Sequence, residues 1–240
     1  MSPCPLVLPL RGLLFDMGDV LYDATAWRRW LVKLLARMGL QTHYRGFYQV
    51  WDHDYLDEVH RGRRDYHEAF RTFLRSAGLS PGQIDEVEAA SHARKRELET
   101  DARPLPGVRA TLKLLSEAGL VLAVLSDSES PADQLRQRLA RLGLAQYFGP
   151  VISSVEMGRT KPDPFCYRSA LAAMNLPAEQ VAFVGHDAGE LRGARRAALR
   201  TIAFNFDPEA VADCYLDRFE QLLPLVSNRH LQAASYQGAA

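Results

Sequence analysis

The chain has 240 residues, of which 47% are hydrophobic and 24% charged. These are the proportions of a globular protein of one or two domains and exclude a disordered chain. The 29 basic and 29 acidic residues give a formal net charge of zero, which argues against a protein that binds nucleic acid by neutralising phosphates over a broad surface. A local basic pocket is not excluded by this balance.

Cysteine usage and hydropathy indicate a soluble cytoplasmic protein. Cys4, Cys166 and Cys214 are too few and too scattered for a disulfide framework or a zinc site. Residues 1–12 are apolar, but no basic residue precedes them and prolines interrupt them, which makes a poor signal peptide. No uncharged apolar run is long enough to span a bilayer, so neither a membrane nor nucleic acid is expected as a partner.

The first predicted element is a short buried strand within residues 12–16, which ends in a turn at residues 17–19. Residues 24–103 then lack strand signals. Apolar side chains recur there at helical spacing, glycines divide the segment into several helices, and all three tryptophans lie within it. An all-helical unit is therefore predicted between the first strand and the rest of the chain.

Beyond residue 103, helices and strands alternate. Strands are predicted at residues 120–126, 150–153, 181–185 and 200–205, and helices at residues 108–118, 132–142, 164–174 and 190–198. Continuous apolar strands joined by helices are typical of an α/β, Rossmann-like parallel sheet with helices on both faces. The predicted core is thus residues 1–23 and 104–240, interrupted by residues 24–103. The small, polar tail from residue 227 is expected to fray.

Chemistry-bearing residues follow the predicted strands, where open parallel sheets bind their ligands. Asp16 ends the first strand, Ser126 ends the second, and an acidic cluster from His186 to Glu190 follows the fourth. Lys161 lies in a proline-rich loop between them. A nucleophile, a hydrogen-bond donor, a fixed cation and acids for magnesium together suit phosphoryl chemistry.

These motifs, in this order, resemble those of the haloacid dehalogenase-like (HAD) hydrolase superfamily over nearly the whole chain. Residues 15–21 match its Asp-x-Asp-Gly turn in part, and Ser126 matches its second motif. Its lysine motif is matched in full by Lys161 and the Pro-Asp-Pro that follows, and its acidic pair is matched loosely by residues 185–190. The helical insertion resembles a type-one cap.

The resemblance implies a phosphatase that acts on a small phosphorylated metabolite. Asp16 would attack phosphorus and form an aspartyl phosphate, with Ser126 and Lys161 binding the phosphate and Lys161 stabilising its charge. Mg²⁺ would be bound by Asp16, the Gly18 carbonyl and Asp187, with Glu190 as an alternative ligand or a support. The oligomeric state is left open.

Two positions depart from the family pattern. Gly18 stands where most phosphatases of this family carry an Asp that protonates the leaving group, and Asp19 suits a left-handed turn better than that role. The substrate then needs little protonation, or a cap residue within 52–61 supplies the acid. His186 replaces a usual acid; since imidazole prefers transition metals, the predicted magnesium ligand is Asp187. His186 either orients Asp187 or simply packs.

Two other functions remain open from the sequence. Gly18 and His186 also fit a degenerate member that binds a phosphorylated ligand or a protein partner without turnover. The family further includes enzymes that hydrolyse carbon–halogen bonds without a metal, as in 2-haloacid dehalogenases, although the acids at 187 and 190 argue against that reading.

Overall fold

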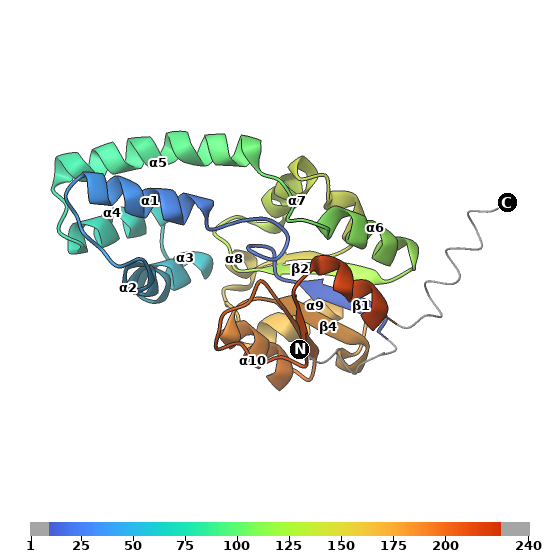
Figure 1. Ribbon diagram of the computed structural model, residues 1–240. Coiled ribbons are helices and arrows are strands. Elements are labelled where there is room, and N and C mark those ends of the chain that lie inside the picture. Colours follow the sequence, from blue (N-terminus) through green and yellow to red (C-terminus); the bar gives the residue numbers. More distant parts are fainter. Residues whose placement is uncertain (1–9, 227–240) are drawn as a thin grey trace.

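The computed structural model describes residues 10–226 (Figure 1). Within this range, six parallel strands form one sheet in the order β3-β2-β1-β4-β5-β6. The strands are β1 (Gly12–Phe15), β2 (Val121–Ser126), β3 (Val151–Ser153), β4 (Val181–Gly185), β5 (Arg200–Phe204) and β6 (Cys214–Leu216). The first strand of the chain therefore lies in the middle of the sheet. Its register aligns Phe15 with Val124 of β2 and with Val184 of β4.

The sheet is covered by helices on both faces. Side chains of β1 alternate between two apolar clusters, because successive residues of a strand point to opposite faces. Leu13 and Phe15 pack with α6 (Val108–Glu117) and α7 (Ala132–Arg141). Leu14 packs with the helices of the opposite face, which are α9 (Pro164–Met174) and α10 (Ala188–Arg196). The predicted α/β, Rossmann-like parallel sheet is confirmed.

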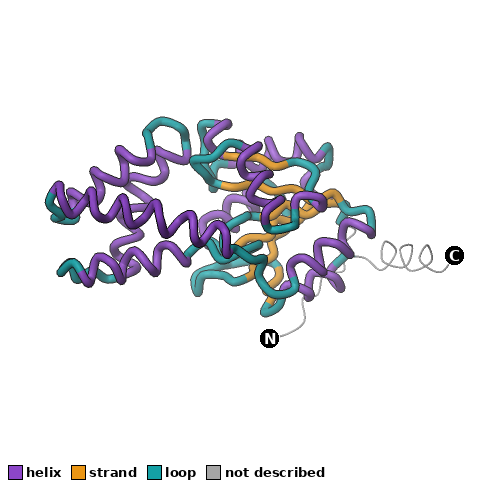
Figure 2. The backbone as a smooth tube through the Cα atoms, turned by 90° about the horizontal axis from the view of Figure 1, so that it is seen from above, coloured by secondary structure: helices purple, strands orange, loops and turns teal. Residues whose placement is uncertain are grey.

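Between β1 and α6 the chain forms only helices and loops. They are α1 (Ala26–Arg37), α2 (Tyr44–Val50), a π-helical turn (Trp51–Leu56), α3 (Asp57–His60), α4 (Tyr66–Ser76) and α5 (Pro81–Asp101). They share an apolar cluster of their own, in which Trp51 is 2% exposed. Figures 1 and 2 show these helices extending from one end of the sheet, and Figure 1 shows α6 on the opposite side of the molecule.

Capping side chains define where two of these helices begin. The Asp65 carboxylate accepts a hydrogen bond from Glu68 N at the start of α4. At the start of α5, Ser80 and Gln83 form a reciprocal capping box, and Pro81 occupies the first turn. Each cap satisfies an N–H that the helix leaves without an internal partner.

The remaining elements differ from the sequence expectations in detail. α10 begins at Ala188, two residues before the predicted start, and the short strand β6 and the 3₁₀ turn Phe219–Leu225 were not predicted. The apolar start and the polar tail lie outside residues 10–226. No helix in the described part of the chain is long and apolar enough to cross a membrane.

Candidate active site

The carboxyl ends of three neighbouring strands bring the predicted site residues together. Asp16 follows β1, Ser126 ends β2, and His186 to Glu190 follow β4. They line a cavity of about 1170 Å³ between the sheet edge and helices α1 to α5. Lys161 enters it from the loop before α9. The sequence prediction that these residues share one rim is confirmed, because β1 lies between β2 and β4.

Asp16, Lys161 and Glu190 form a buried ion-pair triad. Lys161 Nζ lies 2.6 Å from Asp16 Oδ1 and 3.0 Å from Glu190 Oε1. The side chain of Lys161 is fully buried, and that of Asp16 is 7% exposed. A buried lysine with two carboxylate partners is fixed in position, as a group that stabilises phosphoryl charge has to be.

The charges of the triad are unequal. Burial opposes ionisation of Asp16, but Lys161 and His186 outweigh it and lower the pKa of Asp16 below its ordinary value. Burial opposes the charge on Lys161 as well, yet the two carboxylates raise its pKa well above the ordinary value. Burial raises the pKa of Glu190, with Asp16 adding to the effect. The two carboxyl groups therefore shift in opposite directions: Lys161 and His186 favour the ionised form of Asp16, whereas burial disfavours the ionised form of Glu190.

His186 lies on the other side of Asp16 from Lys161. Its Nδ1 is 3.4 Å from Asp16 Oδ2, and its side chain is 26% exposed. Burial lowers the pKa of His186, but the hydrogen bond and charge of Asp16 raise it to about 9. Ligand atoms of Asp16, His186 and Glu190 all lie within 4.8 Å of one another. The histidine therefore belongs to the site and does not merely pack.

Asp187, the expected magnesium ligand, is the N-cap of α10. Its Oδ1 accepts a hydrogen bond from Glu190 N at 2.8 Å. The cap places Glu190 in the first turn of the helix, where its side chain reaches Lys161. Asp187 borders the cavity, but Glu190 rather than Asp187 groups with Asp16 and His186 in the described part of the chain.

The turn after Asp16 has the conformation expected of its residues. Asp19 has a φ of 55°, which agrees with the prediction that it serves a left-handed turn. Its Oδ1 accepts a hydrogen bond from Ala24 N at 2.9 Å. Gly18 and Asp19 both line the cavity. The Asp19 carboxylate is thus engaged by the chain that leads into α1.

Ser126 lies at the end of β2, 7% exposed, and faces the cavity. The next residue, Asp127, was not singled out from the sequence. Both of its carboxylate oxygens accept from Lys161 N, at 3.2 and 3.1 Å. Asp127 therefore fixes the backbone of the lysine whose side chain pairs with Asp16. The sequence signal that could have identified Asp127 is its position directly after the serine that ends a predicted strand.

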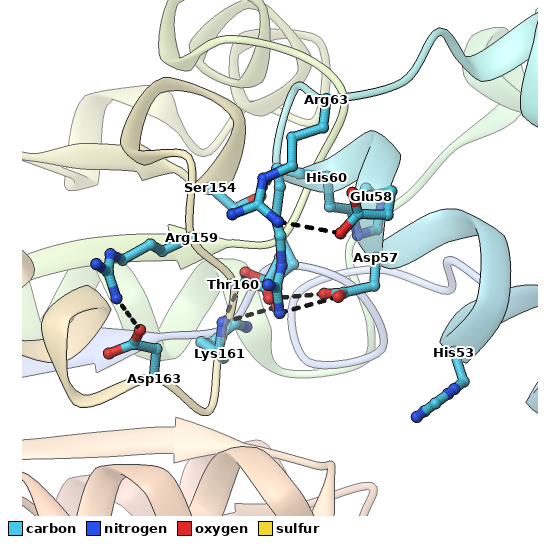
Figure 3. A network of polar contacts seen from close by, with 12 residues as sticks. His53, Asp57, Glu58, His60, Arg63, Ser154, Arg159, Thr160, Lys161 and Asp163 are labelled. Carbon is cyan, nitrogen blue, oxygen red and sulfur yellow. Dashed lines mark hydrogen bonds and ion pairs between the residues drawn. The ribbon is translucent and has the colours of Figure 1, made fainter.

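Residues of α3 attach the helical part to the loop that carries Lys161 and to the short helix α8 (Ser154–Met157), as Figure 3 shows. Thr160 Oγ1 donates to Asp57 Oδ1 at 2.7 Å, and Ser154 Oγ donates to the carbonyl of His60 at 2.8 Å. His53 lies apart from this network in Figure 3, and its side chain is 87% exposed. The contact at Thr160 thus lies one residue from Lys161.

The helical wall of the cavity also contains the stretch expected to hold a substitute acid. Asp52 makes a bidentate ion pair with Arg28, both contacts being 2.7 Å. Asp57 is engaged by Thr160 and by Arg61 at 2.9 Å. Both carboxylates are held by donors, so they are acceptors that shape the wall. Their use as the missing general acid stays untested.

Comparison with known proteins identifies the family. A family model described as a haloacid dehalogenase-like hydrolase matches residues 10–198. The chain belongs to the haloacid dehalogenase-like hydrolases. The resemblance drawn from the motifs is therefore confirmed, and the protein is a hydrolase.

The relatives of this HAD-like hydrolase include phosphatases. A phosphoserine phosphatase of Thermus thermophilus is 35% identical over 151 residues, which are 60% of this chain and 58% of that protein. A phosphoglycolate phosphatase of Yersinia pseudotuberculosis is 26% identical over 230 residues, which are 90% and 93% of the two chains. Among solved structures, a dehalogenase with an intermediate complex has a TM-score of 0.68 at 21% identity, covering 93% of this chain and all of that one. The last likeness shows the fold alone.

Proposed function

We propose that this HAD-like hydrolase is a phosphatase that acts on a small phosphorylated metabolite through an aspartyl phosphate on Asp16. The observation that carries the proposal is the buried Asp16 carboxylate, which faces the cavity and pairs with Lys161 at 2.6 Å. The phosphoserine and phosphoglycolate phosphatases among its relatives support the same reaction class.

In the proposed reaction, a carboxylate oxygen of Asp16 forms a bond to phosphorus while the bond to the leaving-group oxygen breaks. The lowered pKa of Asp16 keeps this nucleophile ionised at neutral pH. Lys161 and Ser126 bind the oxygens of the transferring phosphoryl group. Water then hydrolyses the aspartyl phosphate, which restores Asp16 and releases phosphate.

A divalent cation belongs to this proposal, and Mg²⁺ is the ion that the family resemblance implies. The residues first expected to hold it are Asp16, the Gly18 carbonyl, Asp187 and Glu190. A bound cation would supply positive charge against the phosphoryl oxygens. Asp16 and Glu190 fit that role, because each offers a carboxylate oxygen to a group of ligand atoms that lie within 4.8 Å of one another. His186 adds a nitrogen donor there, which does not suit Mg²⁺.

We further propose that residues 24–103 act as a cap over residues 1–23 and 104–240. The support is the cavity, which is lined by residues of both parts. Such a cap would exclude water from Asp16 and contact the non-phosphate part of the substrate. A cytoplasmic location, where small phosphorylated metabolites are found, remains part of the proposal.

The proposal is tested by phosphate release from a panel of small phosphorylated metabolites, with wild type and Asp16→Asn compared. Loss of the nucleophile is expected to lower turnover by about 10³-fold or more. Equal, slow phosphate release by both proteins would contradict the enzyme and favour a binding protein. Halide release from 2-haloacids, assayed in parallel, would identify a dehalogenase instead.

A further inference from the structure

Three potential metal-ligand atoms converge beside Lys161: the second carboxylate oxygens of Asp16 and Glu190, and Nδ1 of His186. Lys161 engages Asp16 through Oδ1 and Glu190 through Oε1. The second oxygen of each carboxylate is left over, and His186 Nδ1 lies 3.4 Å from Asp16 Oδ2. Glu190 Oε2 is buried and has no hydrogen-bond partner among the described residues, whereas buried His186 Nδ1 has only the long 3.4 Å contact with Asp16 Oδ2.

Buried polar atoms almost always have a good hydrogen-bond partner, so an unpartnered carboxylate oxygen beside a weakly paired imidazole nitrogen requires an explanation. A cation bound between them would satisfy Oε2, Nδ1 and the free oxygen of Asp16 together. The ligand atoms of these residues lie within 4.8 Å of one another. Donors about 2.0 to 2.3 Å from one ion lie at most about 4.6 Å apart, which is close to this limit.

We propose that Asp16, His186 and Glu190 bind a first-row transition-metal ion, with Mn²⁺ as the representative, and that His186 Nδ1 is a direct ligand. The proposal deepens the proposed function by naming the ion, and it rests on the cation site assumed there. Imidazole with two carboxylates suits manganese, iron, cobalt or zinc, whereas Mg²⁺ prefers oxygen ligands throughout.

Asp187 lies outside this group of ligand atoms in the described part of the chain. Its Oδ1 is engaged by Glu190 N at 2.8 Å as the cap of α10. The same hydrogen bond stabilises the first turn of α10. It thereby positions Glu190 in that turn, while His186 lies just before the cap. The competing occupant of the space is a proton on Nδ1, which would pair His186 with Asp16 and leave no nitrogen for an ion.

Electron spin-echo envelope modulation of Mn²⁺ bound to the full chain tests the ligand directly. The wild type is expected to show ¹⁴N modulation from a coordinated imidazole, and His186→Asp is expected to lose it. His53→Asp, the same change at an exposed histidine away from the cavity, should retain it. Wild-type protein that binds no Mn²⁺, or binds it without nitrogen modulation, would overturn the proposal.

Calorimetric titration with MnCl₂ and MgCl₂ measures the selectivity. Most sites bind Mn²⁺ more tightly than Mg²⁺, so the informative quantity is the change in the affinity ratio on mutation. His186→Asp is expected to shift the ratio toward Mg²⁺ by about tenfold or more, and His53→Asp is expected to leave it unchanged. An unaltered ratio in folded His186→Asp would overturn the proposal.

The wild-type modulation needs no variant, so it decides the matter even where His186→Asp fails to fold. His186→Gln supplies a second, uncharged replacement in that case. None of these measurements uses a substrate. Nitrogen coordination without phosphate release would support the ion assignment and refute the phosphatase. Phosphate release without nitrogen coordination would support the phosphatase and refute the ion assignment.

Discussion

Gly18 stands where most phosphatases of the family carry the Asp that protonates the leaving group. Placing an Asp there tests directly whether the site lacks this proton donor. A Cβ at Gly18 would lie 3.0 Å from the Ala24 Cβ, so a side chain there needs only a small shift of the α1 entry. Gly18→Asp is expected to raise the rate on alkyl phosphates by about 10²-fold, because an acid would protonate the poor leaving group. Little gain is expected on p-nitrophenyl phosphate.

Gly18→Asn is the matched control, since it adds nearly the same side chain without the proton. The wild-type rate on aryl phosphates should fall steeply as the leaving-group pKa rises. A flat dependence in the wild type, or equal effects of the Asp and Asn variants, would mean that the acid comes from elsewhere.

The pairing of His186 with Asp16 predicts a pH dependence of stability in protein freed of divalent cations. Burial opposes the charge on His186, but Asp16 raises its pKa from 6.5 to about 9. The folded state therefore holds the proton more tightly than the unfolded state. The stabilisation is fully present below about pH 6.5 and is lost as the pH rises through 9.

Urea unfolding in the presence of EDTA measures this effect between pH 6 and pH 9.5. The wild type should lose free energy of unfolding over that window, and His186→Gln should lose less because it has no proton to release. Parallel declines of the two proteins would show that the pair contributes nothing to stability.

At the scale of elements, variants at the start of α10 distinguish two possible roles of Asp187, as the N-cap of the helix and as a metal ligand. As an N-cap, Asp187→Ala should lower the free energy of unfolding by about 1 kcal/mol, whereas Asn, which also caps helices, should preserve most of it. Mn²⁺ affinity should be nearly the same in Asp187→Asn and wild type. Urea unfolding measures the free energy of unfolding, and calorimetric titration measures the Mn²⁺ affinity.

Asp163→Ala is the control for this prediction. Asp163 caps α9 by accepting from Phe165 N at 2.8 Å, and it lies away from the donor cluster. A similar loss of stability is expected, with no change in metal binding. A large loss of Mn²⁺ affinity in Asp187→Asn would instead restore Asp187 as a ligand.

At the scale of the whole molecule, the cavity joins the helical part to the sheet, and the tryptophans report on it. All three tryptophans lie in residues 24–103, and Trp27 and Trp51 line the cavity while Trp30 does not. Binding of orthovanadate, with MnCl₂ present, is expected to change the intrinsic fluorescence. Trp27→Phe should lose part of that change, with Trp51 carrying the remainder, and Trp30→Phe should keep all of it. Vanadate binding seen by calorimetry without a fluorescence change would exclude the helical wall from the ligand site.

The local pattern was enough to predict the α/β class and the location of Asp16, Ser126 and Lys161. Buried strands are apolar over their whole length, and the polar residue that ends each one is visible in the sequence. The short strand β6 escaped notice because three residues carry too little periodicity to distinguish a strand. Asp127 escaped because its partner, the backbone of Lys161, lies 34 residues away.

The sequence by itself therefore determined the family, the alternation of strands and helices, and which residues meet at the sheet edge, since these follow from hydrophobic runs and motif spacing. The tertiary structure decided what each acid does. Asp187 caps α10, and Glu190, three residues later, reaches the pair formed by Asp16 and Lys161. Side-chain direction at a strand–helix junction depends on where the helix begins, and packing against the sheet sets that beginning. For the same reason His186 stands beside Asp16, in the position that an acid was expected to occupy.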